Sequence, residues 1–291
     1  MNDMYTRPIT HIDRTLFLFA IDCSGSMRET IRFNNISMSK AEAVALVTNY
    51  MIDELVERAR RHDGVRNYYD IGVIGYSGEG VRSMLPQSGD GEYVVAVDRL
   101  VLNMPAVCRT DFDQRLPDGR QTIASFDLHR WIEPLSTGLT PMYEALIEVR
   151  DTLRRWCLRP ENAASFPPVV FNITDGESSD GSCEELCDMA SQIRRTGTSD
   201  GETLLINIHL STDSARGSII FPSSEEACGE DRYSRLLYDM ASTMPAVFDD
   251  AIRSSVGGVS LPPYRGMAYN ASVAQLLTVL DIGSRSVSNI F

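Results

Sequence analysis

The chain has 291 residues, of which 43% are hydrophobic, so it is long and apolar enough to bury a sizeable core. Its 27 lysines and arginines against 40 aspartates and glutamates give a formal net charge of −13 at pH 7. This balance argues against nucleic acids and anionic membrane surfaces as partners, and it favours cations or basic groups. Residues 1–15 lack the apolar core of a signal peptide, so we expect a cytoplasmic protein with reduced cysteines.

The first half of the chain alternates apolar runs with one amphipathic helix. Leu16–Ile21 is nearly all apolar and predicts a strand covered on both faces. After a polar loop, residues 40–61 carry apolar side chains at helical spacing and predict a helix. A second buried strand is expected at Tyr68–Ser77 and a third β-prone segment at 92–103. Residues 103–130 are polar, and we interpret them as an insertion or long loop.

The second half repeats the alternation of strands and helices. The strands are expected within 167–178 and 203–211, and the helices at 141–156, 183–195, 231–242 and 270–283, the first of them opening with Pro141. This order predicts an α/β fold with a doubly wound, mainly parallel central sheet flanked by helices on both faces. We expect a tail at 1–13, a single domain at 14–282 with the insertion inside it, and a C-terminal tail at 283–291.

Oxygen-rich clusters follow two of the predicted strands, and a third cluster enters a helix. The clusters contain Asp22, Ser24 and Ser26 in "AIDCSGSM", Asp175 in "NITDGESSD" and Thr140 in "STGLTPMYEAL". Ligands of open α/β sheets bind beyond the carboxyl ends of the strands, so these side chains converge if the clusters share one edge. Two carboxylates and three hydroxyls, without sulfur or imidazole, suit Mg²⁺ or Mn²⁺.

This pattern resembles the von Willebrand factor type A (vWA) family, in its bacterial cytoplasmic form, and its metal-ion-dependent adhesion site. The family has Asp-x-Ser-x-Ser after the first strand, a distant Thr and an Asp after the fourth strand, and this chain has each element in that order. The resemblance covers most of residues 14–282 and is faintest in 77–130 and after 212. Cys23 occupies a variable position of the motif, and the separation of Ser26 from Thr140 is longer than usual.

The resemblance implies a Rossmann-like fold and a set of metal ligands. Ser24, Ser26 and Thr140 would offer hydroxyl ligands, while Asp22 and Asp175 would bind the ion directly or through water. It further implies an open coordination position that takes an Asp or Glu carboxylate from a partner protein. The implied function is a non-enzymatic recognition module, and bacterial relatives often act as scaffolds beside AAA+ ATPases or kinase and phosphatase partners in stress-response gene clusters.

The alternative function is a metal-dependent phosphatase or other phosphoryl-transfer enzyme, because an Asp at a strand end with Mg²⁺ also serves that chemistry. Against it, Asp22-Cys23-Ser24 lacks the second Asp two residues on that haloacid-dehalogenase-type enzymes show. The three clusters also contain no lysine that could hold a phosphate.

Three weaker motifs favour structural roles. Cys183 and Cys187 could form half of a zinc site, but no second pair completes it, and we expect ordinary packing. "GYSGE" nearly forms a hydrolase elbow, but Glu79 stands where the last glycine belongs, so we do not expect Ser77 to act as a nucleophile. Glu177 and Asp180 could support the metal site indirectly, although a solvated loop is the favoured interpretation.

Overall fold

The structure is a computed structural model that describes residues 4–33, 36–86, 88, 92–115, 120–210, 217–256 and 261–284. The predicted C-terminal tail therefore lies outside the described residues from 285 onward. The main sheet has the strand order β15-β16-β14-β11-β1-β6-β7, with β8 also paired to β6. These strands are β1 (Thr15–Asp22), β6 (Tyr69–Ser77), β7 (Gly80–Ser83), β8 (Val94–Ala96), β11 (Val169–Thr174), β14 (Leu204–Leu210), β15 (Ile219–Ile220) and β16 (Met267–Ala271).

The main sheet is parallel at its centre and antiparallel at its edges. Strands β16, β14, β11, β1 and β6 run parallel, whereas β15, β7 and β8 pair antiparallel with their neighbours. The chain moves from β1 to β6 on one side and later returns to β11 on the other side of β1. The strand order therefore reverses at β1, which is the place where open α/β sheets bind ligands.

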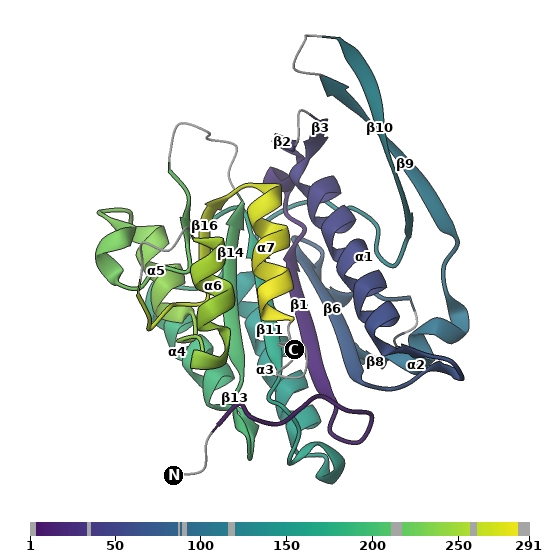
Figure 1. Ribbon diagram of the computed structural model, residues 1–291. Helices are drawn as coiled ribbons and strands as arrows, with labels where there is room; N and C mark the ends of the chain where they lie inside the picture. The colour runs from purple at the N-terminus through teal and green to yellow at the C-terminus, as the bar shows by residue number, and fades with distance from the viewer. Residues whose placement is uncertain are drawn as a thin grey trace.

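Helices cover both faces of this sheet, which confirms the doubly wound prediction (Figure 1). One face is covered by α1 (Lys40–Ala59), α2 (Val97–Leu100), α6 (Asp249–Ser255) and α7 (Val273–Gly283). The other face is covered by α3 (Met142–Cys157), α4 (Cys183–Arg195) and α5 (Arg232–Met240). Strand β1 sends Phe17 and Phe19 into the first core and Leu16 and Leu18 into the second, so its nearly continuous apolar sequence is explained.

Residues 103–130 are not a long loop. They contain β9 (Val107–Arg115) and β10 (Gln121–His129), an antiparallel hairpin that projects past the carboxyl edge of the main sheet (Figure 1). The hairpin joins β2 (Thr30–Phe33) and β3 (Ile36–Ser39) in a four-stranded sheet of order β10-β9-β3-β2. Most side chains of β10 are exposed and Phe126 is half-buried, so the sequence is polar enough to be mistaken for a loop.

Other differences concern short elements. The polar loop predicted before α1 contains the β2–β3 hairpin, and residues 92–103 form β8 followed by α2 and a 3₁₀ turn. The helix predicted at 270–283 begins at Val273, because the preceding residues form β16. Pro141 is the N-cap of α3 rather than its first helical residue. The minor pairs are β4 (Arg60–Arg61) with β5 (Gly64–Val65) and β12 (Gly197–Thr198) with β13 (Gly201–Glu202).

Within the described ranges, no helix combines the length and the apolar character required to cross a membrane.

Candidate functional site

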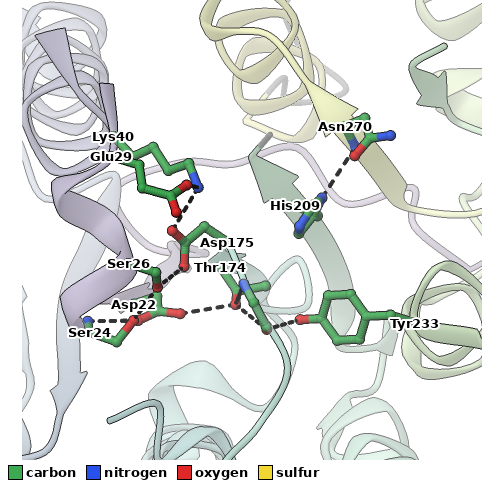
Figure 2. Close-up of polar contacts among 11 residues, drawn as sticks. Asp22, Ser24, Ser26, Glu29, Lys40, Thr174, Asp175, His209, Tyr233 and Asn270 are labelled. Atoms are coloured by element: carbon green, nitrogen blue, oxygen red, sulfur yellow. Dashed lines mark hydrogen bonds and ion pairs between the residues drawn. The ribbon is translucent and has the colours of Figure 1, made fainter. Parts of the chain in front are cut away.

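The two predicted acidic residues lie next to each other at the carboxyl edge of the sheet. Asp22 is the last residue of β1, and Asp175 follows the last residue of β11. The two strands are parallel neighbours, with Ile21 opposite Ile173, so both chains leave the sheet at the same edge. Because the strand order reverses at β1, the carboxylates occupy the expected ligand position of this fold (Figure 2).

Asp22 is a buried carboxylate with hydrogen bonds but no counter-charge. The Ser24 amide donates to its Oδ1 over 2.8 Å, and the Thr174 hydroxyl donates to its Oδ2 over 3.0 Å. The residue is 0% exposed, and this burial raises its pKa to about 6, although the bonds from Ser24 and Thr174 oppose the shift. No cationic side chain of the described chain pairs with Asp22. A bound cation would therefore relieve an uncompensated buried charge.

Ser24 and Ser26 connect Asp22 to Asp175. Their hydroxyl oxygens lie 3.0 Å apart, and the Ser26 hydroxyl donates to Asp175 Oδ1 over 2.7 Å (Figure 2). Ser24 has extended backbone angles and is the N-cap of the 3₁₀ helix η1 (Gly25–Arg28), so the chain turns immediately beyond the sheet. The structure thus brings four of the five predicted ligands into one hydrogen-bonded chain, in which Asp22 is joined through the Ser24 amide and the other links are between side-chain oxygens.

Thr140 lies in the loop that packs beside this chain. The Gly25 amide donates to the Gly138 carbonyl over 2.9 Å, and the Thr137 amide donates to the Cys23 carbonyl over 2.6 Å. The Thr140 amide donates to the Ser179 hydroxyl, the Thr140 carbonyl accepts from the Ser179 amide, and Thr140 is 9% exposed. No hydrogen bond links its hydroxyl to the other four predicted ligands in the part of the chain that the structure describes. Its position as a ligand remains a prediction.

Lys40 is a residue of this site that the sequence did not reveal. Its ammonium group donates to Asp175 Oδ2 over 2.9 Å and to Glu29 Oε2 over 2.7 Å, and the residue is only 3% exposed. The β2–β3 hairpin brings it there, because the Lys40 amide pairs with the Glu29 carbonyl at the base of that hairpin. The three sequence clusters contain no lysine, but the fold supplies one to Asp175.

The residues present fit a hard divalent cation. Asp22, Ser24 and Ser26 offer a carboxylate and two hydroxyls in mutual contact, and Asp175 faces them through Oδ1. Lys40 occupies Asp175 Oδ2, so Asp175 would contribute only its other oxygen. Across the described ranges no group of three histidine, cysteine, aspartate or glutamate side chains could hold a metal.

The opposite side of the Asp175 turn is formed by neutral groups. His209 stacks on Tyr269 with ring centroids 4.5 Å apart, and burial lowers its pKa to about 4. His209 is therefore uncharged at pH 7 and adds no positive charge to the site. The Tyr233 hydroxyl donates to the Gly176 carbonyl and fixes the turn that follows Asp175 (Figure 2).

Three weaker candidates have structural roles. Asp180 accepts hydrogen bonds from the Tyr143 and Glu144 amides, so it caps the N-terminus of α3 rather than lying in a solvated loop without partners. Ser77 is buried at the end of β6, and a turn to the antiparallel β7 follows it, whereas a hydrolase elbow leads into a helix. Cys183 and Cys187 are free thiols packed against the second core, as expected.

Comparisons with known proteins give only distant likenesses. No protein-family model and no curated protein matches the chain. Among solved structures, the chain is similar to the SpRpn10 VWA domain, with 7% identity, a TM-score of 0.42 and coverage of 79% of this chain and 83% of that one. It is also similar to an aerotolerance-related membrane protein from Bacteroides fragilis, with 14% identity, a TM-score of 0.37 and coverage of 93% and 100%. An uncharacterised membrane-spanning protein from Vibrio fischeri has 13% identity, a TM-score of 0.26 and coverage of 68% and 70%. Scores this low carry no argument about function, and the fold class rests on the strand order itself.

Proposed function

We propose that the chain is a protein-recognition module that holds Mg²⁺ or Mn²⁺ at its carboxyl edge and binds an Asp or Glu side chain of a partner protein. The observation that carries this proposal is the continuous set of contacts from Asp22 through Ser24 and Ser26 to Asp175, at the point where the strand order reverses. By the family resemblance, the proposed setting is a cytoplasmic bacterial stress-response complex linked to an AAA+ ATPase, a kinase or a phosphatase.

Each residue of the site has a defined part in this proposal. Ser24, Ser26 and Asp22 would hold the cation with Asp175, and Thr140 would approach from the neighbouring loop. The cation would supply an open coordination position for an anionic oxygen. Lys40 neutralises Asp175, which lowers the repulsion that a protein of net charge −13 exerts on an incoming carboxylate.

The burial of Asp22 supports recognition over phosphoryl transfer. A nucleophilic aspartate must place an oxygen against its substrate, whereas Asp22 is 0% exposed and both its oxygens accept hydrogen bonds. A carboxylate in this position can still support a cation through a bound water molecule. Lys40 is already engaged by two carboxylates and has little freedom to hold a phosphate. Turnover of p-nitrophenyl phosphate with Mg²⁺, abolished in Asp22→Ala, would instead establish the enzyme.

The proposal is tested by capturing the partner from a lysate of the source organism with the immobilised protein in Mg²⁺. We expect the same partner to be released by EDTA and to be retained poorly by Thr140→Ala. Thr137→Ala is the matched control, because Thr137 lies in the same loop and its hydroxyl donates to the exposed Glu79 rather than to a predicted ligand. Retention of the partner in EDTA, with Thr140→Ala behaving as the wild type, would place recognition on another surface.

A further inference from the structure

A polar cavity lies at the other end of the sheet from the candidate metal site. It has a volume of about 420 Å³ and adjoins Thr203, the residue immediately before β14. Three arginines line it, Arg194 and Arg195 at the end of α4 and Arg265 just before β16. The cavity thus concentrates positive charge in a protein whose overall charge is strongly negative.

Two of these arginines are held against the same backbone oxygen. Arg194 Nη1 donates to the Ala241 carbonyl over 2.8 Å, and Arg265 Nη1 donates to that carbonyl over 3.1 Å. The guanidinium of Arg265 also lies over the Tyr238 ring, 4.8 Å from its centroid. The C-terminus of α5 therefore fixes two like charges side by side, and burial together with the charge of Arg265 lowers the pKa of Arg194.

These charges are opposed only in part by a carboxylate, because burial and Arg265 lower the pKa of Arg194 more than Glu202 raises it. None of the three arginines forms an ion pair with any residue that the structure describes, although Glu202 also lines the cavity. Nε and Nη2 of Arg194 and Arg265 make no hydrogen bond within the described chain, so each guanidinium keeps one free edge. A guanidinium edge of this kind is suited to bidentate binding of an oxyanion.

A buried hydroxyl in the same lining also lacks a partner. Thr203 is 1% exposed, and among the described residues its hydroxyl oxygen has no hydrogen-bond partner. Its backbone is satisfied, because its amide donates to the Thr196 carbonyl and its carbonyl accepts from the Ser242 hydroxyl. Buried polar groups nearly always have a partner, so the unpaired hydroxyl is independent evidence for a ligand here.

We propose that this cavity binds a dianionic phosphate group, carried either by a small phosphate monoester or by a phosphorylated side chain. A phosphate offers several acceptor oxygens and two negative charges, which match two guanidinium edges and the Thr203 hydroxyl better than a singly charged carboxylate does. The cavity volume leaves room for the group that carries the phosphate. The site is separate from the proposed metal site and does not depend on it.

Isothermal titration with inorganic phosphate, in EDTA and at constant ionic strength set with chloride, tests the proposal. We expect saturable binding that weakens about tenfold or more in Arg194→Gln/Arg265→Gln, since charge-assisted hydrogen bonds are lost. Arg253→Gln is the control, because Arg253 lies on α6, away from the cavity, and pairs with the exposed Asp250. EDTA removes the metal, so this result is independent of the proposed recognition function.

Thr203→Val separates ligand binding from a purely structural role of the arginines. The substitution keeps the shape and removes the unpaired hydroxyl, so the melting temperature should stay equal or rise while phosphate binds more weakly. Absence of saturable binding, or equal binding by wild type and all three variants, would overturn the proposal and leave an adventitious ion only. If phosphate binds, a phosphoserine peptide and its unphosphorylated form are titrated next. Tighter binding of the phosphopeptide than of either phosphate or the unphosphorylated peptide indicates a protein ligand. Otherwise the ligand is a small phosphate monoester.

Discussion

Replacement of Lys40 by methionine should destabilise the metal-free protein and strengthen its response to Mg²⁺. The ammonium of Lys40 and the carboxylate of Asp175 are 2.9 Å apart, with side-chain exposures of 4% and 0%. Methionine keeps the length of the side chain but leaves the buried Asp175 charge without its cation. Removal of one partner from a buried ion pair lowers the free energy of unfolding by about 3–5 kcal/mol. This corresponds to a fall in melting temperature of roughly 6–10 °C.

The assay is urea unfolding of wild type and Lys40→Met, first in EDTA and then with saturating Mg²⁺. Because the variant lacks a cation beside Asp175, bound Mg²⁺ should recover part of the lost stability, and its gain should exceed that of the wild type. Arg58→Met is the control on the same helix, since its pair with Asp281 at 3.2 Å is more exposed and should contribute less than about 1 kcal/mol.

A double variant isolates the pair itself. In Lys40→Met/Asp175→Asn both charges are absent, so the loss of stability in EDTA should be smaller than in Lys40→Met alone. The reasoning is refuted if Lys40→Met loses no more stability than Arg58→Met, or if Mg²⁺ stabilises wild type and Lys40→Met equally.

Further predictions concern His209, Trp156 and Gly138. The pKa of His209 is lowered to about 4 in the folded protein, so between pH 7 and pH 5 the imidazole takes up a proton in the unfolded chain but stays neutral in the folded one. The contribution of His209 to the free energy of unfolding should therefore be about 2 kcal/mol lower at pH 5 than at pH 7. The raised pKa of Asp22 acts in the opposite direction over the same range, so the difference between wild type and His209→Gln in urea unfolding is the quantity to measure. Trp156→Phe removes the 2.7 Å bond from Nε1 to the buried Asp70 and should cost about 1–3 kcal/mol in the same assay. Gly138→Ala should lower the melting temperature and weaken Mg²⁺ binding, because φ is +68° and the new Cβ would lie 2.7 Å from Gly78 Cα; Gly217→Ala, in open space, should change neither.

Elements with a strong local signal could be predicted from the sequence. The predicted helix at 183–195 is confirmed residue for residue as α4, because Ser182 and Glu185 form a capping box at its start. Strands β1 and β11 are buried on both faces, so their apolar runs alone identify them. The positions of Asp22 and Asp175 at the carboxyl edge of the sheet follow from that assignment.

Elements whose structure depends on distant partners could not be predicted. Strands β2 and β3 have four residues each, too few for their alternation of polar and apolar residues to identify strands, and their sheet is completed only by the distant β9–β10 hairpin. Lys40 was missed for the same reason, because the β2–β3 hairpin brings it to Asp175. The contact of Asp180 with α3 likewise joins residues more than thirty positions apart and leaves no local pattern.

The central claim is that the oxygen atoms of Asp22, Ser24, Ser26 and Asp175 form a site for a hard divalent cation. Its most direct test is calorimetric titration of Mg²⁺ into wild type, Ser24→Ala/Ser26→Ala and Ser178→Ala. The double variant removes both hydroxyls and leaves the Lys40–Asp175 pair intact, whereas Ser178 contacts Asp180 outside the set. The account predicts saturable binding with one ion per chain in wild type and Ser178→Ala and its loss in the double variant. Equal binding by all three proteins, or none by the wild type, would contradict it.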